Sequence, residues 1–169
     1  VLVHSVPRAA ADVLRWRHST LRAATQHAKQ LGLAGAAFPW RTINGDECSG
    51  YWPAGTAAFH VNADIADAVI RYVNATDDVA FERDVGPELL VEPARLWRSL
   101  GHHDVQGAFR IDGVTGPDEY GALADNTVYT NLMAQRNLRA AAVSCERHHE
   151  VARKCNVTPE EMADWRAAA

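Results

Sequence analysis

The feature that most constrains the fold is the segment 56–75, in which apolar residues recur with the period of an α-helix. The first apolar position is followed by others four, seven, eight and eleven residues later, so all of them fall on one helix face. These residues are Val61, Ile65, Ala68, Val69 and Tyr72. The opposite stripe carries His60, Asp64, Asp67 and Arg71. The segment is therefore predicted to be an amphipathic helix with a solvated polar face.

Helix-start and helix-stop signals predict further helices along the chain. Pro7 and Pro87 suit the first turn of a helix, and Gly32 and Gly101 suit its end. The predicted helices cover 7–16, 20–30, 86–100, 123–146 and a stretch that follows residue 158, where Thr158 suits the N-cap, Pro159 the first turn and Glu161 the third helical position. The core residues expected on the two longest of these helices are Leu89, Leu96, Trp97, Leu100, Val128, Leu132, Met133 and Leu138. A short strand is expected at 109–114, where apolar and polar residues alternate.

Paired helices with long loops predict an all-α fold, either a toroidal (α/α) barrel or a helical array. The two most elaborate loops each precede a long helix, so we expect them at the same end of the fold. The sequence lacks an initiator Met, and its last helix is expected to run past Ala169. Residues 1–169 are therefore expected to be part of a longer chain.

Composition excludes several classes of function. The net charge of −4 predicts no nucleic-acid partner. No segment approaches the roughly 18 to 20 apolar residues of a membrane span, and the start lacks the pattern of a signal peptide. The three cysteines have no zinc-site or disulfide spacing, which predicts free thiols in a reducing cytoplasm and no metal site. Abundant Arg and Ala are typical of a high-GC bacterial gene.

The segment 35–55 is long and aromatic, which favours a functional loop over a simple connection. Trp40 offers a flat apolar face on which a sugar can stack, although a Trp in this position could also belong to the core. Arg41 and Glu47 could hydrogen-bond sugar hydroxyls or form an ion pair that shapes the loop. The loop therefore has the composition of a sugar-binding site.

A second candidate loop follows the predicted strand. Gly116 and Pro117 force a turn, and the carboxylates Asp118 and Glu119 come next, with Tyr120 beside them. Rigid loops at a helix entrance commonly present catalytic groups. The ordinary alternative is a surface turn in which the first carboxylate caps a helix. His60, at the start of its helix, and Asn126 are weaker candidates for the same pocket.

Several motifs occur in a fixed order along the chain. They are Phe-Pro-Trp-Arg-Thr at 38–42, Gly-Asp-Glu at 45–47, Tyr-Trp-Pro-Ala-Gly-Thr-Ala at 51–57, His-Val-Asn-Ala-Asp-Ile-Ala at 60–66, Gly-Pro-Asp-Glu-Tyr at 116–120, Asp-Asn at 125–126, Tyr-Thr-Asn at 129–131 and Met-Ala at 133–134. The series resembles family 65 of the glycoside hydrolases, the maltose, trehalose and kojibiose phosphorylase family. The resemblance implies that residues 1–169 are a segment of a catalytic (α/α)6 barrel with long active-site loops.

The resemblance also implies a reaction, the inverting attack of inorganic phosphate on an α-linked glucose disaccharide. Glu119 takes the position of the general acid, and Asp118 and Tyr120 lie beside it. Phosphate is then a co-substrate, no cofactor is needed, and the anion site lies beyond Ala169. The full-length protein is expected to be a homodimer, and this chain alone is expected to be inactive.

The chain departs from the family pattern at Gly121, where members commonly carry a His after the Glu-Tyr pair. This departure leaves the linkage and the acceptor sugar open. Two alternatives to phosphorolysis also stay open. One is a hydrolase on the same barrel that uses water, and the other is a non-catalytic helical interaction module.

Overall fold

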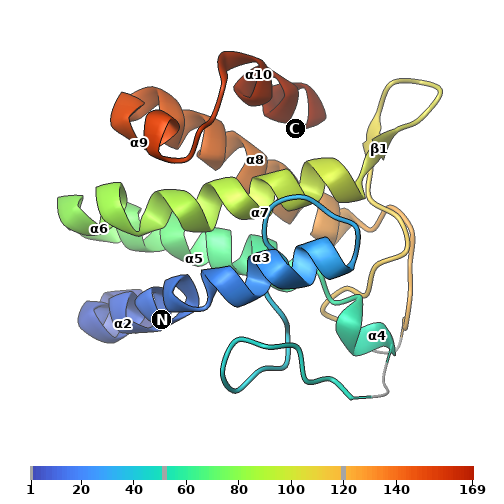
Figure 1. Ribbon diagram of the computed structural model, residues 1–169, viewed down its shortest axis with the longest axis horizontal. Helices are drawn as coiled ribbons and strands as arrows, with labels where there is room; N and C mark the ends of the chain where they lie inside the picture. The colour runs from blue at the N-terminus through green and yellow to red at the C-terminus, as the bar shows by residue number, and fades with distance from the viewer. Residues whose placement is uncertain (1, 51–52, 119–120) are drawn as a thin grey trace.

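The computed structural model describes residues 2–50, 53–118 and 121–169, which form helices joined by long loops, with one small hairpin (Figure 1). The elements in chain order are α1 (Leu2–Ser5), α2 (Pro7–Ser19), α3 (Leu21–Gln30), α4 (Pro53–Thr56), α5 (His60–Ala75), α6 (Val79–Asp84), α7 (Gly86–Leu100), β1 (His102–His103), β2 (Phe109–Arg110), α8 (Val128–Arg147), α9 (His149–Lys154) and α10 (Pro159–Ala168). The predicted all-α class is confirmed, because helices dominate the described ranges.

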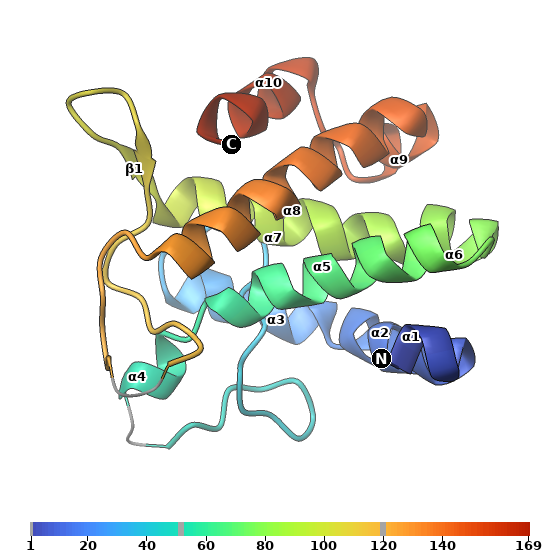
Figure 2. The same ribbon diagram turned by 180° about the vertical axis from the view of Figure 1, so that it is seen from behind.

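Helix α7 lies at the centre of the core, with α5 and α8 packed against it and against each other (Figures 1 and 2). Leu89, Leu96 and Trp97 of α7 are fully buried, which confirms their predicted core role, and Leu100 is half-buried. The indole Nε1 of Trp97 donates to Asn137 Oδ1 at 3.1 Å, and Asn137 Nδ2 donates to the Leu90 carbonyl at 2.9 Å. A buried polar pair thus fixes α8 against α7.

Helix α5 confirms most of the predicted amphipathic pattern. Ile65, Val69 and Tyr72 are buried, whereas Ala68 is exposed, so the prediction for Ala68 was wrong. The buried stripe is rotated toward Asn62, Ala63 and Ala66, because α5 packs on α7 and α8 together. The helix also begins later than predicted, at His60, since residues Pro53–Thr56 form the separate helix α4.

Helix α8 differs most from its prediction. It begins at Val128, not near 123, because the preceding residues belong to a loop in which Asn126 takes a left-handed backbone conformation with φ of 55°. Val128 and Leu132 were predicted to be core residues but are 74% and 57% exposed. The face that α8 buries contains mostly small residues beside Leu138, namely Thr130, Ala134, Asn137, Leu138, Ala141, Ala142 and Cys145. Small side chains let α8 approach α5 and α7 closely.

The predicted strand at 109–114 is confirmed only for its first two residues. Phe109 and Arg110 pair antiparallel with His103 and His102, and the resulting hairpin projects from the helices (Figure 1). The hairpin lies close to the end of α7. A Cβ atom on Gly101 would lie only 2.2 Å from the Phe109 ring, so this position has no room for a side chain. Further along, Val114 forms an isolated bridge with Ala124.

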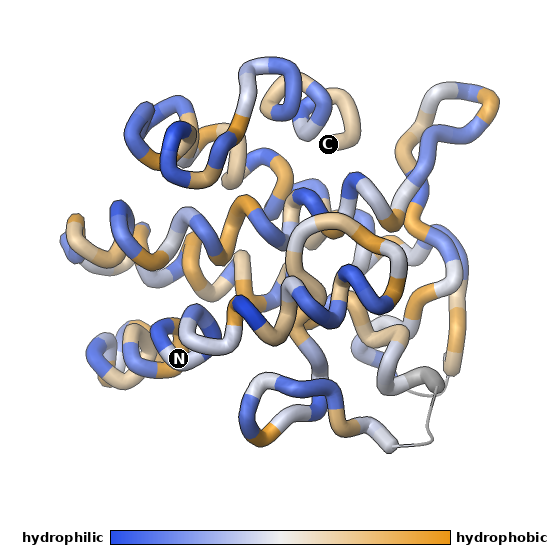
Figure 3. The backbone as a smooth tube through the Cα atoms, in the orientation of Figure 1, coloured by the Kyte–Doolittle hydropathy of each residue, from blue (hydrophilic) through white to orange (hydrophobic). Residues whose placement is uncertain are grey.

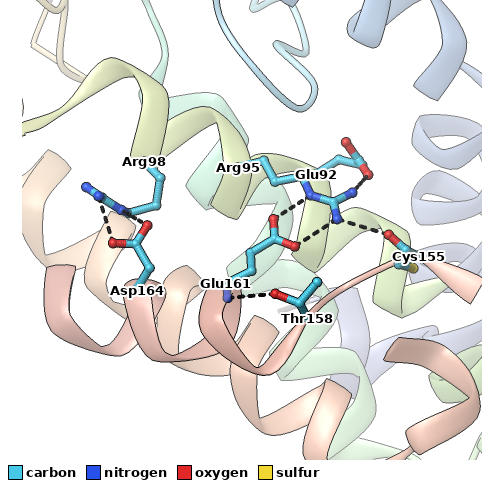
Figure 4. A network of polar contacts seen from close by, with 7 residues as sticks. All are labelled: Glu92, Arg95, Arg98, Cys155, Thr158, Glu161 and Asp164. Atoms are coloured by element: carbon cyan, nitrogen blue, oxygen red, sulfur yellow. Dashed lines mark hydrogen bonds and ion pairs between the residues drawn. The ribbon is translucent and has the colours of Figure 1, made fainter. Parts of the chain in front are cut away.

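A network of charged side chains joins α10 to α7 (Figure 4). The Arg95 guanidinium donates to both Glu161 carboxylate oxygens, at 2.7 and 3.0 Å, and to Glu92 at 2.6 Å. These carboxylates raise the pKa of Arg95 above its usual range, with the Glu161 hydrogen bonds as the largest cause. Arg98 and Asp164 form a second paired contact at 2.6 and 2.8 Å.

The start of α10 confirms its predicted cap. The Thr158 hydroxyl accepts a hydrogen bond from the Glu161 amide at 3.2 Å, and Pro159 occupies the first turn. Capping of this kind fixes the register of the helix at its first residue. It therefore also fixes Glu161 where Arg95 can reach it.

Hydrophobic and hydrophilic residues alternate around the helices, as expected for elements with one buried side (Figure 3). Among the described residues, no helix has the length and apolar character needed to cross a membrane. Cys145 and Cys155 are buried free thiols, and Cys48 is exposed. Burial raises the pKa of Cys145 to about 11, which disfavours a reactive thiolate there.

Candidate active site

The two loops that the sequence singles out lie at the same end of the helices. The loop between α3 and α5 and the loop between β2 and α8 meet beside the first turn of α5 (Figures 1 and 2). The Thr115 amide donates to the Ala57 carbonyl at 3.0 Å, which joins the two loops, and the His60 ring at the start of α5 contacts the Thr115 carbonyl at 3.0 Å. The expected co-location of the two loops is therefore observed.

The aromatic loop is anchored just before Trp40. The Phe38 amide donates to Asn62 Oδ1 at 2.7 Å, and Arg17 Nη1 donates to the Pro39 carbonyl at 3.3 Å. Burial lowers the pKa of Arg17. The Phe38 side chain is 2% exposed and belongs to the main core. The loop thus leaves the core with a fixed direction, and Trp40 is the first residue after this anchor.

Trp40 and Arg41 lie together on the surface beyond the anchor. Trp40 is half-buried, and the Arg41 guanidinium lies over its ring at 4.8 Å from the centroid. A guanidinium in this position is attracted to the negative ring face and limits the orientations available to the indole. The pair offers one flat apolar surface and one fork of hydrogen-bond donors, which suits the recognition of a sugar ring and its hydroxyls.

Glu47 lies in the returning half of the same loop and interacts with its neighbours. Its carboxylate accepts from the Ser49 amide at 2.5 Å and from the Thr56 hydroxyl at 3.5 Å. Of the two roles that the sequence leaves open for Glu47, this arrangement favours the shaping of the loop. The carboxylate reaches Ser49 and Thr56, whereas the sequence leaves open an ion pair with Arg41.

The second loop is closed at its base by pairs of backbone bonds. Val114 and Ala124 exchange two hydrogen bonds at 3.1 and 2.9 Å, and the Thr115 hydroxyl donates to the Ala122 carbonyl at 2.5 Å. These contacts give the loop a rigid base. Asp118 is exposed on this loop. The predicted roles of Glu119 and Tyr120 fall on residues that lie outside the described ranges.

His60 and Asn126 flank the base of this loop from two sides. His60 is 7% exposed, and its imidazole faces the Tyr129 ring edge-on at 6.4 Å between centroids. Asn126 is exposed. Its backbone N–H donates to the Ile111 carbonyl at 2.8 Å, and its side-chain Oδ1 accepts from Asn131 Nδ2 at 2.6 Å. Both residues therefore hold the loop through hydrogen bonds to this chain.

Sequence reasoning missed two residues of this region, Asn62 and Tyr129. Asn62 is fully buried, and Tyr129 donates its hydroxyl proton to Asp64 at 2.7 Å. The hydrogen bond to Asp64 is the main reason that the pKa of Tyr129 rises to about 12. A signal for Asn62 existed, because it shares a helix face with Ile65 and Val69, and a polar residue on a buried face needs hydrogen-bond partners.

Within the described ranges, His, Cys, Asp and Glu side chains do not gather into a group of three or more that could hold a metal ion. The described side chains at this end supply carboxylates, amides, hydroxyls, a guanidinium, an imidazole and aromatic rings. Such groups bind neutral polyols through many hydrogen bonds and one stacking surface. The loops thus have the character of a carbohydrate site on a helical scaffold.

Comparison with known proteins agrees with this character. The family model of the glycosyl hydrolase family 65 central catalytic domain matches residues 1–169. The chain is 59% identical over 169 residues to an uncharacterized glycosyl hydrolase of Mycobacterium tuberculosis strain H37Rv, covering 100% of this chain and 22% of that protein. It is 46% identical over 178 residues to the α,α-trehalose phosphorylase of Geobacillus stearothermophilus, covering 100% of this chain and 23% of that enzyme.

The fold has a close match among solved structures. A "Putative kojibiose phosphorylase from human microbiome" superposes with a TM-score of 0.88 at 29% identity, covering 96% of this chain and 25% of that chain. The helical architecture is thus consistent with a segment of the (α/α)6 barrel. The chain belongs to glycosyl hydrolase family 65, and it spans about a fifth to a quarter of the length of the relatives it matches.

Proposed function

We propose that the complete protein cleaves an α-linked glucose disaccharide by inverting phosphorolysis, giving β-glucose 1-phosphate and a free sugar. Residues 1–169 supply the general acid and part of the sugar pocket, and the rest of the protein supplies the phosphate site. The observation that carries the proposal is the 46% identity to a trehalose phosphorylase over the whole chain. Identity to maltose and kojibiose phosphorylases is lower, at 33% and 32%, so trehalose is the first candidate substrate.

The chemistry assigns distinct tasks to the two loops. Glu119, in the loop between β2 and α8 (the acid loop), protonates the glycosidic oxygen as the bond to the anomeric carbon breaks. Phosphate attacks that carbon from the opposite face, which inverts its configuration from α to β. Because phosphate is already an anionic nucleophile, no second carboxylate is needed as a base. Trp40 and Arg41 hold the sugar, and Asp118, Tyr120 and Asn126 are candidates for further contacts.

The test is an assay of the complete protein on trehalose, maltose and kojibiose, with and without inorganic phosphate. The proposal expects glucose 1-phosphate in the β configuration, formed only when phosphate is present. Release of two glucose molecules without phosphate would assign the protein to the hydrolase alternative. No reaction with any α-glucoside would favour a non-catalytic role. The 169-residue chain assayed alone is expected to be inactive, because it lacks the proposed phosphate site.

A further inference from the structure

The first turn of α5 holds the bases of both candidate loops. His60 contacts the Thr115 carbonyl through Nδ1 at 3.0 Å, and Asn62 accepts from the Phe38 amide at 2.7 Å. Thr115 immediately precedes the Gly-Pro-Asp-Glu-Tyr motif, and Phe38 stands two residues before Trp40. One helical turn therefore contacts the backbone of both loops, at points 55 and 24 residues away along the chain.

The His60 contact requires a proton on Nδ1. A carbonyl oxygen can only accept a hydrogen bond, so Nδ1 must carry the proton that it donates. The side chain is 7% exposed, which leaves little surface for a sugar to reach. The same stretch of backbone is held a second time, because the Thr115 amide donates to the Ala57 carbonyl at 3.0 Å. Both polar groups of the Thr115 backbone thus face the α5 entrance.

Asn62 is committed to the backbone in the same way. Its Oδ1 accepts from the Phe38 amide, and its Nδ2 donates to the Phe59 carbonyl at 2.9 Å. The residue is 0% exposed, so it cannot contact a substrate. A buried amide with both ends bonded to backbone is a rigid link, because either bond would leave an unsatisfied polar group if it broke.

We propose that His60 and Asn62 are positioning residues that set the acid loop and the aromatic loop, which contains Trp40, relative to each other. The proposal rests on the function proposed above, in which one loop delivers the proton and the other holds the sugar. His60 acts on the proton-delivery step through Thr115, and Asn62 acts on sugar binding through Phe38. Neither side chain touches the substrate. This revises the sequence-based hypothesis that His60 is itself a sugar contact.

The expected size of the effect follows from the sensitivity of catalysis to placement. A displacement of about 1 Å in a catalytic group can reduce turnover by about 10²-fold. A loop that loses its link to α5 keeps its amino acids but delivers them in the wrong place. The loss therefore depends on how much the substrate needs the proton, and this dependence separates positioning from general instability.

The first test compares His60→Asn with His60→Gln in the complete protein. The Asn amide places an N–H near the position of Nδ1, whereas the Gln amide places it near Nε2, away from Thr115. Turnover of the disaccharide is expected to fall about 10²-fold in the Gln variant and less than about tenfold in the Asn variant, with KM nearly unchanged. His60→Ala with and without added imidazole provides a second comparison, in which imidazole should restore part of the lost turnover.

Each variant is also assayed with α-glucosyl fluoride, whose leaving group needs little protonation. If His60 positions the acid loop, turnover of the fluoride should stay within about threefold of wild type while disaccharide turnover falls. Equal losses on both substrates, or equal effects of Asn and Gln, would overturn the proposal for His60. The comparison is valid whether phosphate or water accepts the glucosyl group, so a wild type that proves to be a hydrolase refutes only the proposed function.

The second test concerns Asn62. Asn62→Asp keeps an acceptor for the Phe38 amide, and Asn62→Ala removes it. The Ala variant is expected to raise KM about tenfold or more with a smaller change in turnover, while the Asp variant stays closer to wild type. An unchanged KM in a folded Ala variant would overturn the proposal for Asn62.

The matched control for His60→Asn is His149→Asn. His149 is an exposed His on α9 at the far end of the helices, and this variant should have the activity of the wild type.

Discussion

The α7–α10 interface and the loop end of the molecule are held together by different kinds of polar contact. Between α7 and α10, charged side chains meet charged side chains, and Arg95, with 22% of its side chain exposed, bridges Glu92 and Glu161. At the loop end, the side chains of His60 and Asn62 meet backbone groups. The first arrangement joins two regular helices, and the second fixes segments that have no regular structure of their own.

The two regions should therefore respond differently to the loss of one contact. An ion-pair network between helices contributes free energy of folding, but each helix keeps its internal geometry when one pair is removed. A side chain bonded to a loop carbonyl determines where that loop lies, because a loop has no ladder of internal hydrogen bonds. We therefore expect stability to be most sensitive at α7–α10 and activity to be most sensitive at the loop end.

The largest expected effect comes from Glu119→Gln in the complete protein. A Gln amide cannot supply the proton, so turnover of disaccharides should fall by about 10² to 10⁴-fold with the melting temperature unchanged. Asp118→Asn is the control, and it should lose less because an amide can still hydrogen-bond a hydroxyl. Activity close to wild type in a clean preparation of the Gln variant would remove Glu119 from the acid role. It would also contradict the expectation that activity is most sensitive at the loop end.

The second effect concerns the opposite region. Arg95→Met leaves the carboxylates of Glu92 and Glu161 without their shared partner, and we expect a loss of about 2–4 kcal/mol in the free energy of unfolding. Turnover per folded molecule should stay unchanged. Arg83→Met removes an exposed pair with Asp84 and should change the stability far less, because solvent screens such a pair. Chemical denaturation measures both, and a large change in turnover for Arg95→Met would contradict the proposed division.

The sequence could predict the helices better than the loops, for a physical reason. Apolar periodicity and caps depend on residues three or four apart, so α5, α7 and the Thr158 cap of α10 were predictable. The short helices α1, α6 and α9 offer too few turns for a pattern, and the sequence does not predict them. Leu123 and Val128 are apolar, but Leu123 lies in a loop and Val128 lies at the exposed start of α8. Periodicity alone cannot distinguish such exposed apolar residues from core residues.

The same limit applies to the candidate site. The sequence identified both loops, and it placed them at one end from their order alone. It could not predict that the His60 ring would meet a carbonyl 55 residues away, or that Asn62 would bind the Phe38 amide. Such contacts depend on how the loop backbone folds in three dimensions, which no local spacing records. The roles of Glu119 and Tyr120 stay predictions based on the sequence.

The third effect concerns Trp40 in the aromatic loop. Trp40→Ala should weaken sugar binding by about 1–3 kcal/mol, or roughly 5- to 150-fold, if the indole stacks on the sugar. Since Trp40 is only half-buried, the melting temperature should change little. Calorimetric titration with the sugar and a thermal melt of the same variant measure both quantities. A fully buried core Trp would give the reverse, a stability loss of about 3–5 kcal/mol with a smaller loss of affinity.

The smallest expected effect tests the helix side through pH. Asp78 caps α6 by accepting from the Phe81 amide at 3.0 Å, and it also accepts from the Tyr72 hydroxyl at 2.7 Å. These two bonds lower the pKa of Asp78, the Phe81 amide contributing most. Asp78→Ala should cost about 1–2 kcal/mol at neutral pH. A depressed pKa in the folded state means that the carboxylate stabilises the fold above its unfolded pKa of about 3.9 and loses this effect as the pH falls through the folded value. The difference in unfolding free energy between the variant and wild type should therefore shrink below about pH 4. A difference that stays constant down to low pH would assign the effect to packing and not to the charged cap.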